Sequence, residues 1–118
     1  MKYGLDDKYY DALIGVFPKY PEVESVILYG SRAKGNYKPF SDIDITLKGS
    51  TLTRQLLGKI FTSIDDLLLP YFLDISIYDQ LKDKAFVEAI DKTGVEIYRK
   101  PLNLTIQPSN NSSNVTVC

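Results

Sequence analysis

Asp42 and Asp44 are separated by one residue in a stretch, residues 42–47, that alternates strictly between polar and apolar side chains. Such alternation predicts a β-strand, in which residues i and i+2 point to the same face about 6–7 Å apart. Both carboxylates can therefore reach one shared site. Mg²⁺ prefers hard oxygen ligands and usually takes one or two carboxylates together with substrate phosphates. The pair therefore predicts metal-dependent phosphoryl-transfer chemistry.

A basic turn bounded by Gly30 and Gly35 precedes the two acids. Glycine takes backbone angles that other residues resist, so main-chain N–H groups can converge on an anionic oxygen without a side chain in the way. Hydroxyl and cationic side chains add further donors, namely Ser31, Arg32, Lys34 and Ser41. Our interpretation is that the turn holds a triphosphate, while the acids hold the metal ions that bridge it to the attacking group.

Three other phosphate or metal motifs do not match the sequence. A Walker P-loop requires Lys-Ser or Lys-Thr after its second glycine, whereas Gly35 is followed by asparagine. A dinucleotide-binding fingerprint requires glycine where Arg32 stands. An EF-hand loop beginning at Asp42 requires glycine and glutamate in place of Leu47 and Thr53.

The composition narrows the function further. The 118 residues suit one domain, and a formal net charge of −1 argues against a protein that coats nucleic acid, so we expect no direct nucleic-acid binding. The chain has no histidine, so proton transfer must use carboxylates, lysine, tyrosine or water. The single cysteine, Cys118, excludes a disulfide framework and a zinc cluster. No apolar run is long enough for a membrane span and the N-terminus is not a signal peptide, so we expect a cytoplasmic protein.

The periodicity of apolar residues predicts an α/β domain over residues 1–100. Helices are expected over residues 5–17, 52–68 and 79–92, and strands over 26–29, 42–47, 71–78 and 95–98. Gly94 suits a left-handed C-terminal cap of the third helix. Residues 101–118, rich in asparagine and serine, are expected to form a flexible tail. The fold class is thus a short mixed sheet covered by helices, with the acids lining one open face.

At the turn and the acid pair the chain resembles a known family. The run from Gly30 to Gly35, followed by Ser41-Asp42-Ile43-Asp44, is similar to the GS-R-A-x-G…S-D-x-D signature of the DNA polymerase β-like nucleotidyltransferase superfamily. Within it, the chain resembles the minimal nucleotidyltransferases that are paired with HEPN-domain toxins. The resemblance covers about residues 5–98 and implies the polymerase β-like fold.

The resemblance also implies a role for each motif residue. Asp42 and Asp44 would bind metal, and Asp74, inside Tyr-Phe-Leu-Asp-Ile-Ser-Ile-Tyr, would complete the metal site and deprotonate the acceptor. The motif also implies four nucleotide-binding positions. Gly30 and Ser31 would bind the phosphates, and Arg32 and Ser41 are motif positions with less sharply defined roles.

The implied activity is Mg²⁺-dependent transfer of AMP from ATP to a hydroxyl, with two metal ions and a tyrosine of a partner HEPN toxin as acceptor. The protein would then be an antitoxin that acts by enzymatic modification. One alternative is an interaction module that neutralises the toxin by binding alone. Another is an antibiotic-modifying nucleotidyltransferase, although such enzymes usually carry an added acceptor-binding domain. Three acids on one face favour an enzyme over a pure binder.

Overall fold

The structure, a computed structural model, describes residues 1–101. Its helices and strands follow one another as α1 (Asp7–Ile14), β1 (Ser25–Tyr29), α2 (Gly30–Lys34), β2 (Ile43–Lys48), α3 (Arg54–Asp65), β3 (Leu73–Ile77), α4 (Lys84–Thr93) and β4 (Val95–Arg99). Two short 3₁₀ turns, η1 (Phe17–Lys19) and η2 (Tyr78–Gln80), lie between them. The predicted tail falls almost entirely on residues 102–118, outside the described part.

The four strands form one mixed sheet in the order β3-β2-β1-β4. β1 pairs antiparallel with both β2 and β4, while β2 pairs parallel with β3. A parallel pair needs a crossover connection, and α3 supplies it between β2 and β3. The predicted α/β class with a short mixed sheet is confirmed.

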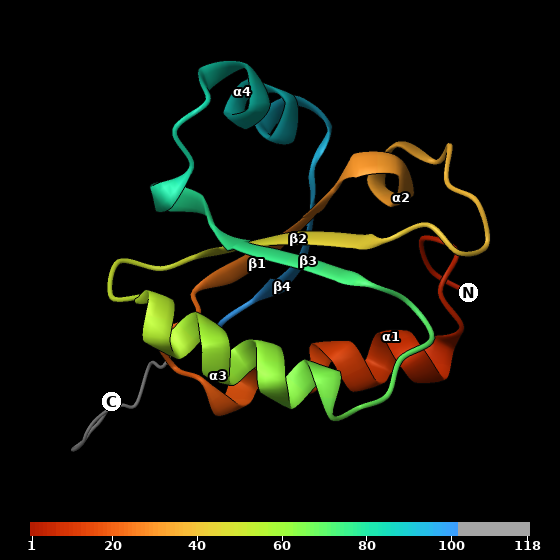
Figure 1. Cartoon of the computed structure of the whole chain (residues 1–118), viewed down its shortest axis with the longest axis horizontal. Coiled ribbons are helices and arrows are strands. Elements are labelled where there is room, and N and C mark those ends of the chain that lie inside the picture. Colours follow the sequence, from red (N-terminus) through yellow and green to blue (C-terminus); the bar gives the residue numbers. More distant parts are fainter. Residues whose placement is uncertain (102–118) are drawn as a thin grey trace, which may run out of the picture.

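The hydrophobic core lies on one face of this sheet. Every odd-numbered residue of β2 from Ile43 to Leu47 is buried, because alternate side chains of a strand share a face. Helices α1 and α3 cover this face, and α3 contributes the buried side chains of Ile60 and Ile64 (Figure 1). Complete burial of an aliphatic side chain of this size stabilises the fold by about 1.5–3 kcal/mol. The opposite face carries the acids, and among residues 1–101 the helices on that side are α2 and α4 (Figure 1).

The ends of two helices differ from the sequence-based expectation. Helix α3 begins after Thr53, whose hydroxyl accepts a hydrogen bond from the Leu56 N–H, and it stops at Asp65. Leu68 was assigned to its apolar stripe, but the side chain is 85% exposed at a positive φ of 56°. The predicted left-handed cap at Gly94 is wrong, since this glycine is extended, with φ −69° and ψ 153°.

Gly94 is nevertheless required, because two other parts of the chain approach it closely. A Cβ at this position would lie 2.5 Å from the Ile90 carbonyl oxygen and 2.6 Å from Cγ2 of Ile27. Glycine therefore serves close packing of α4 against the sheet here. The left-handed glycine cap occurs instead at Gly35, which ends α2 with φ 85°.

Among the described residues, no helix combines the length and the apolarity that crossing a membrane would require. The cytoplasmic location stays a prediction.

Replacement of Gly94 by alanine is expected to destabilise the fold by about 1–3 kcal/mol, because the added methyl group overpacks a close backbone contact. Gly58→Ala in α3 is the matched control, since a Cβ there meets nothing within 4 Å. The control should stabilise the protein by up to about 1 kcal/mol through helix propensity. Urea denaturation measures both changes, and a neutral Gly94→Ala would contradict the close approach.

Candidate active site

Three neighbouring strands place Tyr29, Asp44 and Asp74 in one row across the sheet. Asp44 of β2 is the register partner of Tyr29 on β1 and of Asp74 on β3. Register partners present their side chains on the same face of a sheet, with adjacent strands about 4.8 Å apart. The structure therefore makes Asp44 and Asp74, which are thirty residues apart in sequence, direct neighbours.

Asp42 lies at the entrance to β2, one residue before the strand begins, and is exposed. It belongs to the same electrostatic cluster. Burial raises the pKa of Asp44, the charges of Asp74 and Asp42 raise it further, and the Arg32 guanidinium opposes this effect. The charges of Asp42 and Asp74 thus both act on the half-buried Asp44.

The predicted glycine turn is a short helix, α2, that starts at Gly30 directly after β1. Gly30 has φ 74°, a conformation that strains any residue with a Cβ. It also lies directly against Asp44, because a Cβ here would collide with the Asp44 carboxylate. Gly30 therefore brings the N-terminus of α2, with Ser31 as its second residue, against the acid row.

Arg32 is the most deeply buried charged side chain of residues 1–101, with a relative exposure of 1%. Its Nη1 donates to the Tyr3 carbonyl at 2.9 Å, and its Nε and Nη2 donate to the Ser41 carbonyl at 3.1 and 2.8 Å. The rings of Tyr37 and Tyr71 lie 5.4 and 4.8 Å from its guanidinium carbon. In this structure, Arg32 therefore ties three chain segments together.

Ser41 closes the loop between α2 and β2. Its hydroxyl accepts a hydrogen bond from the Lys38 N–H at 2.8 Å, and its own N–H donates to the Lys38 carbonyl at 3.0 Å. Together with the Arg32 contacts, these bonds set the path of the chain into Asp42. Within the described residues, Arg32 and Ser41 thus support the loop that precedes the acids.

Tyr29 is largely buried on a central strand, and the strand register also places it beside the acids. Burial raises its pKa to about 12, with further contributions from Asp74 and then Asp44, while a hydrogen bond with Ser76 opposes the shift. Phe86 of α4 packs edge-on against the Tyr29 ring, with centroids 5.5 Å apart. Ser76 lies two residues after Asp74 and on the same face of β3, yet only the strand register brings Tyr29 beside the acids.

The acid row is not a closed metal cage. In the part of the chain from residue 1 to residue 101, no three His, Cys, Asp or Glu side chains converge closely enough to hold a metal ion. The donors present are nevertheless carboxylates whose mutual repulsion is offset by a single guanidinium, Arg32. Such a set suits a hard divalent cation that keeps water and substrate phosphates among its ligands, which is how Mg²⁺ usually binds.

Arg32→Lys is expected to destabilise the protein by roughly 2–4 kcal/mol, because hydrogen bonds from a charged donor contribute about 1.5–3 kcal/mol and a lysine ammonium cannot replace the planar fork. Arg54→Lys, at the exposed start of α3, is the control and should stay within about ±0.5 kcal/mol. Urea denaturation distinguishes the two. Equal tolerance at both positions would show that the Arg32 network does not hold the loop.

Asp44→Asn is expected to leave the Tm unchanged or raise it at neutral pH in EDTA. The folded-state pKa of Asp44 lies above its unfolded value. The stability contributed by the protonated carboxyl is therefore present at low pH and is lost as pH rises through the folded pKa. The asparagine amide has the same shape as the carboxyl but no charge, so it removes the cost of holding an ionised Asp44 beside the other acids. A calorimetric scan showing a markedly lower Tm for Asp44→Asn than for wild type would contradict the carboxylate repulsion.

Solved structures similar to this one share its fold at low sequence identity. A chain of a toxin–antitoxin structure with AMP-PNP has a TM-score of 0.61 at 18% identity, over 81% of this chain and 75% of that one. A chain of the complex between a tri-AMPylated HEPN toxin of Shewanella oneidensis and an MNT antitoxin has a TM-score of 0.60 at 14% identity, over 81% and 74%. A chain of the MntA–HepT toxin–antitoxin structure has a TM-score of 0.58 at 14% identity, over 80% and 74%.

No curated protein sequence matches the chain. The family described as "Polymerase beta, Nucleotidyltransferase" matches residues 11–102, which include the α2 turn and all three acids. The motif, the mixed sheet and the acid row agree with this match. The chain therefore belongs to the polymerase beta nucleotidyltransferase family.

Proposed function

We propose that this nucleotidyltransferase domain transfers AMP from ATP to a hydroxyl, most specifically a tyrosine hydroxyl, of a partner HEPN-domain toxin. The observation that carries the proposal is the register of β2 and β3, which sets Asp44 beside Asp74 with Asp42 at the same end of the strand. A structural role would not require carboxylates to be grouped where they repel one another. Grouping them becomes useful when they receive a polyphosphate and its cations.

In the proposed reaction, the acceptor oxygen attacks the α-phosphorus of ATP. A new oxygen–phosphorus bond forms, the bond between the α-phosphorus and the α,β-bridging oxygen breaks, and pyrophosphate leaves with that electron pair. Asp74 accepts the proton of the attacking hydroxyl. This role suits Asp74 because it is exposed on the outer strand of the sheet, where a protein acceptor can approach.

The other motif residues position the nucleotide. The backbone N–H groups at the start of α2, with the Ser31 hydroxyl, would bind phosphate oxygens, and Gly30 keeps this approach free of a side chain. Arg32 and Ser41 would act on the nucleotide through the loop that they hold, and the Arg32 charge also moderates the repulsion at Asp44. Asp42 and Asp44, with Asp74, would hold two Mg²⁺ ions. When bound, Mg²⁺ neutralises triphosphate charge and lowers the pKa of the attacking hydroxyl.

The partner is proposed from the structures that share the fold. Two of the structures that share the fold are described as complexes of toxin and antitoxin, and in one of them the HEPN toxin is tri-AMPylated. Modification of the toxin would make this chain an antitoxin. Neutralisation by binding alone is the alternative, and it needs neither ATP nor the acids.

Substitution of both metal-site acids, Asp42→Asn with Asp44→Asn, is expected to abolish AMP transfer while the fold is kept. Asp74→Asn should retain Mg·ATP binding and lose a factor of roughly 10²–10⁴ in transfer rate, the usual contribution of a general base. Asp79→Asn, at an exposed position outside the row, is the matched control. Wild-type turnover in the double variant would show that these acids do not form the site.

The reaction itself is tested by mixing the chain with a HEPN-domain toxin, ATP and Mg²⁺. We expect mass spectrometry to find added AMP on a tyrosine, and the modified toxin should stay inactive after this chain is removed. EDTA should prevent the modification, because the triphosphate charge is then not neutralised. Complete neutralisation in EDTA without any change in toxin mass would favour the binding-only alternative instead.

A further inference from the structure

Several large apolar side chains stay exposed at one end of β3, although most others of their kind are buried. Phe40 and Phe72 are each 82% exposed, and Leu68 is 85% exposed. We call the area that they form with Phe61, Leu69 and Tyr71 the β3-edge surface. Contiguous exposed apolar area of this kind marks an interaction site more often than isolated apolar residues do.

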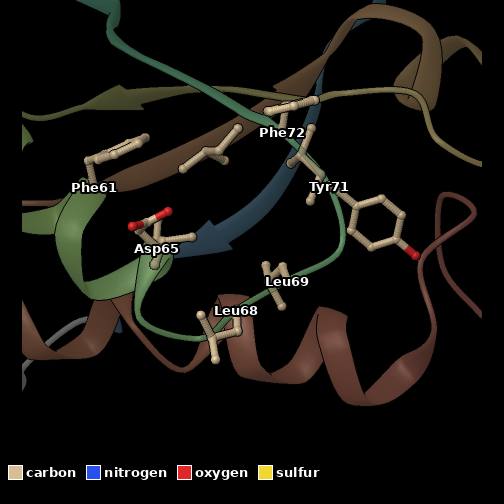
Figure 2. Close-up of a pocket in the computed structure, with 9 residues that line it drawn as sticks. Phe61, Asp65, Leu68, Leu69, Tyr71 and Phe72 are labelled. Atoms are coloured by element: carbon tan, nitrogen blue, oxygen red, sulfur yellow. The ribbon is translucent and has the colours of Figure 1, made fainter.

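The β3-edge surface is hollowed. A cavity of about 330 Å³ lies between the end of α3 and the start of β3 and includes Phe61, Leu68 and Phe72 in its lining. Figure 2 shows these side chains around the cavity, with Asp65 among them. A second cavity of about 310 Å³ is bordered by Phe40 and shares Phe72 with the first. The apolar area therefore extends from the loop before β2 to the loop after α3.

This surface is continuous with the acid row. Phe40 precedes Asp42 by two residues, and Phe72 precedes Asp74 by two residues. The Phe72 carbonyl accepts a hydrogen bond from the Ile43 N–H at 2.9 Å, which fixes the start of β3 beside the start of β2. A molecule lying on Phe40 and Phe72 would therefore be adjacent to the carboxylate that is proposed to take the acceptor proton.

We propose that the protein acceptor docks on the β3-edge surface, through an apolar segment that is flanked by lysine or arginine and carries the hydroxyl to Asp74. This inference rests on the proposed function, because it names how the acceptor of that reaction is held. The outer edge of β3 supports it. β3 is the last strand of the sheet, and no described residue pairs with its outer side, so its backbone groups remain open to an incoming chain.

The charges beside the surface indicate which occupant fits. Asp65 is the charged residue in the lining of the two cavities. Two more acids, Asp42 and Asp74, follow Phe40 and Phe72 in the sequence, whereas the loop before Phe40 contributes one basic residue, Lys38. A second copy of this chain would bring the same carboxylates against one another. A nucleobase would cover Phe40 and Phe72 but would leave Leu68, at the far end of the area, exposed. A protein segment with apolar and cationic side chains matches both the extent and the charge.

Two single variants test the docking, Phe72→Ser near the acids and Leu68→Ser away from them. Both side chains are exposed, so the fold should persist. We expect each to weaken, at least tenfold in calorimetry without nucleotide, the binding of a HEPN-domain toxin that the wild-type chain binds, and to raise the KM for that protein with little change in kcat. Mg·ATP affinity should stay within twofold of wild type. Asp65→Lys should also weaken partner binding, whereas Glu88→Ser on α4 is the control that should change neither quantity.

The outcomes separate this inference from the proposed function. If wild type binds the HEPN-domain protein through Phe72 and Leu68 but transfers no AMP, the docking surface stands and the reaction is wrong. If AMP is transferred while both variants keep wild-type Kd and KM, the docking inference is overturned. The docking inference is also overturned if Phe72→Ser lowers Mg·ATP affinity tenfold while Leu68→Ser changes neither ATP nor partner binding. That result would mean that the Phe40 and Phe72 rings stack on the nucleobase.

Two further results would name a different occupant and overturn the inference as well. A wild-type dimer in light scattering that Phe72→Ser dissociates would assign the surface to a second copy of this chain. Removal of residues 102–118 could also increase the binding of a hydrophobic dye strongly. If Phe72→Ser abolished that increase, the β3-edge surface would be assigned to the C-terminal segment.

Discussion

The repulsion among three carboxylates on one face of a small sheet is the constraint on which the rest of the structure depends. Asp44 is half-buried beside Asp74, and burial together with the neighbouring charges raises its pKa. This arrangement costs stability, so it needs support elsewhere. The other face of the same strands supplies that support, because Ile43, Ile45 and Leu47 are fully buried against the helices. One strand thus carries the core on its odd residues and Asp44 on its opposite face.

Arg32 links the site to the rest of the fold. Its guanidinium is the nearby positive charge that lowers the pKa of Asp44, and it also holds the carbonyls of Tyr3 and Ser41. One buried side chain therefore fixes the loop that leads into Asp42 and moderates the electrostatic cost of the acid row. Its motif position alone would suggest a group that reaches into solvent for phosphate. Because Arg32 is buried and bonded to the loop carbonyls, it has a structural role in positioning the loop.

Local patterns predicted the elements well, whereas contacts between distant segments could not be predicted. Alternation in β2 and β3 correctly placed Asp44 and Asp74 on the face opposite the core, because strand periodicity depends on neighbours in sequence. The register that makes Asp44 a neighbour of Tyr29 depends on tertiary pairing and left no local signal. Gly94 was misassigned partly for the same reason: besides the Ile90 carbonyl one turn earlier in α4, the contact that requires glycine comes from Ile27 on another strand. Leu68 fitted the helical period, yet the helix ended before it.

The central claim, that the acid row transfers a nucleotide and not a phosphate, is tested most directly by following the position of a radiolabel. The chain is incubated with a HEPN-domain toxin, Mg²⁺, and ATP that is labelled at either the α- or the γ-phosphate. We expect the α-label to become covalently attached to the toxin, while γ-label appears only in released pyrophosphate, and we expect Asp44→Asn to abolish both signals. Attachment of γ-label to the partner would identify phosphoryl transfer instead and would contradict the account.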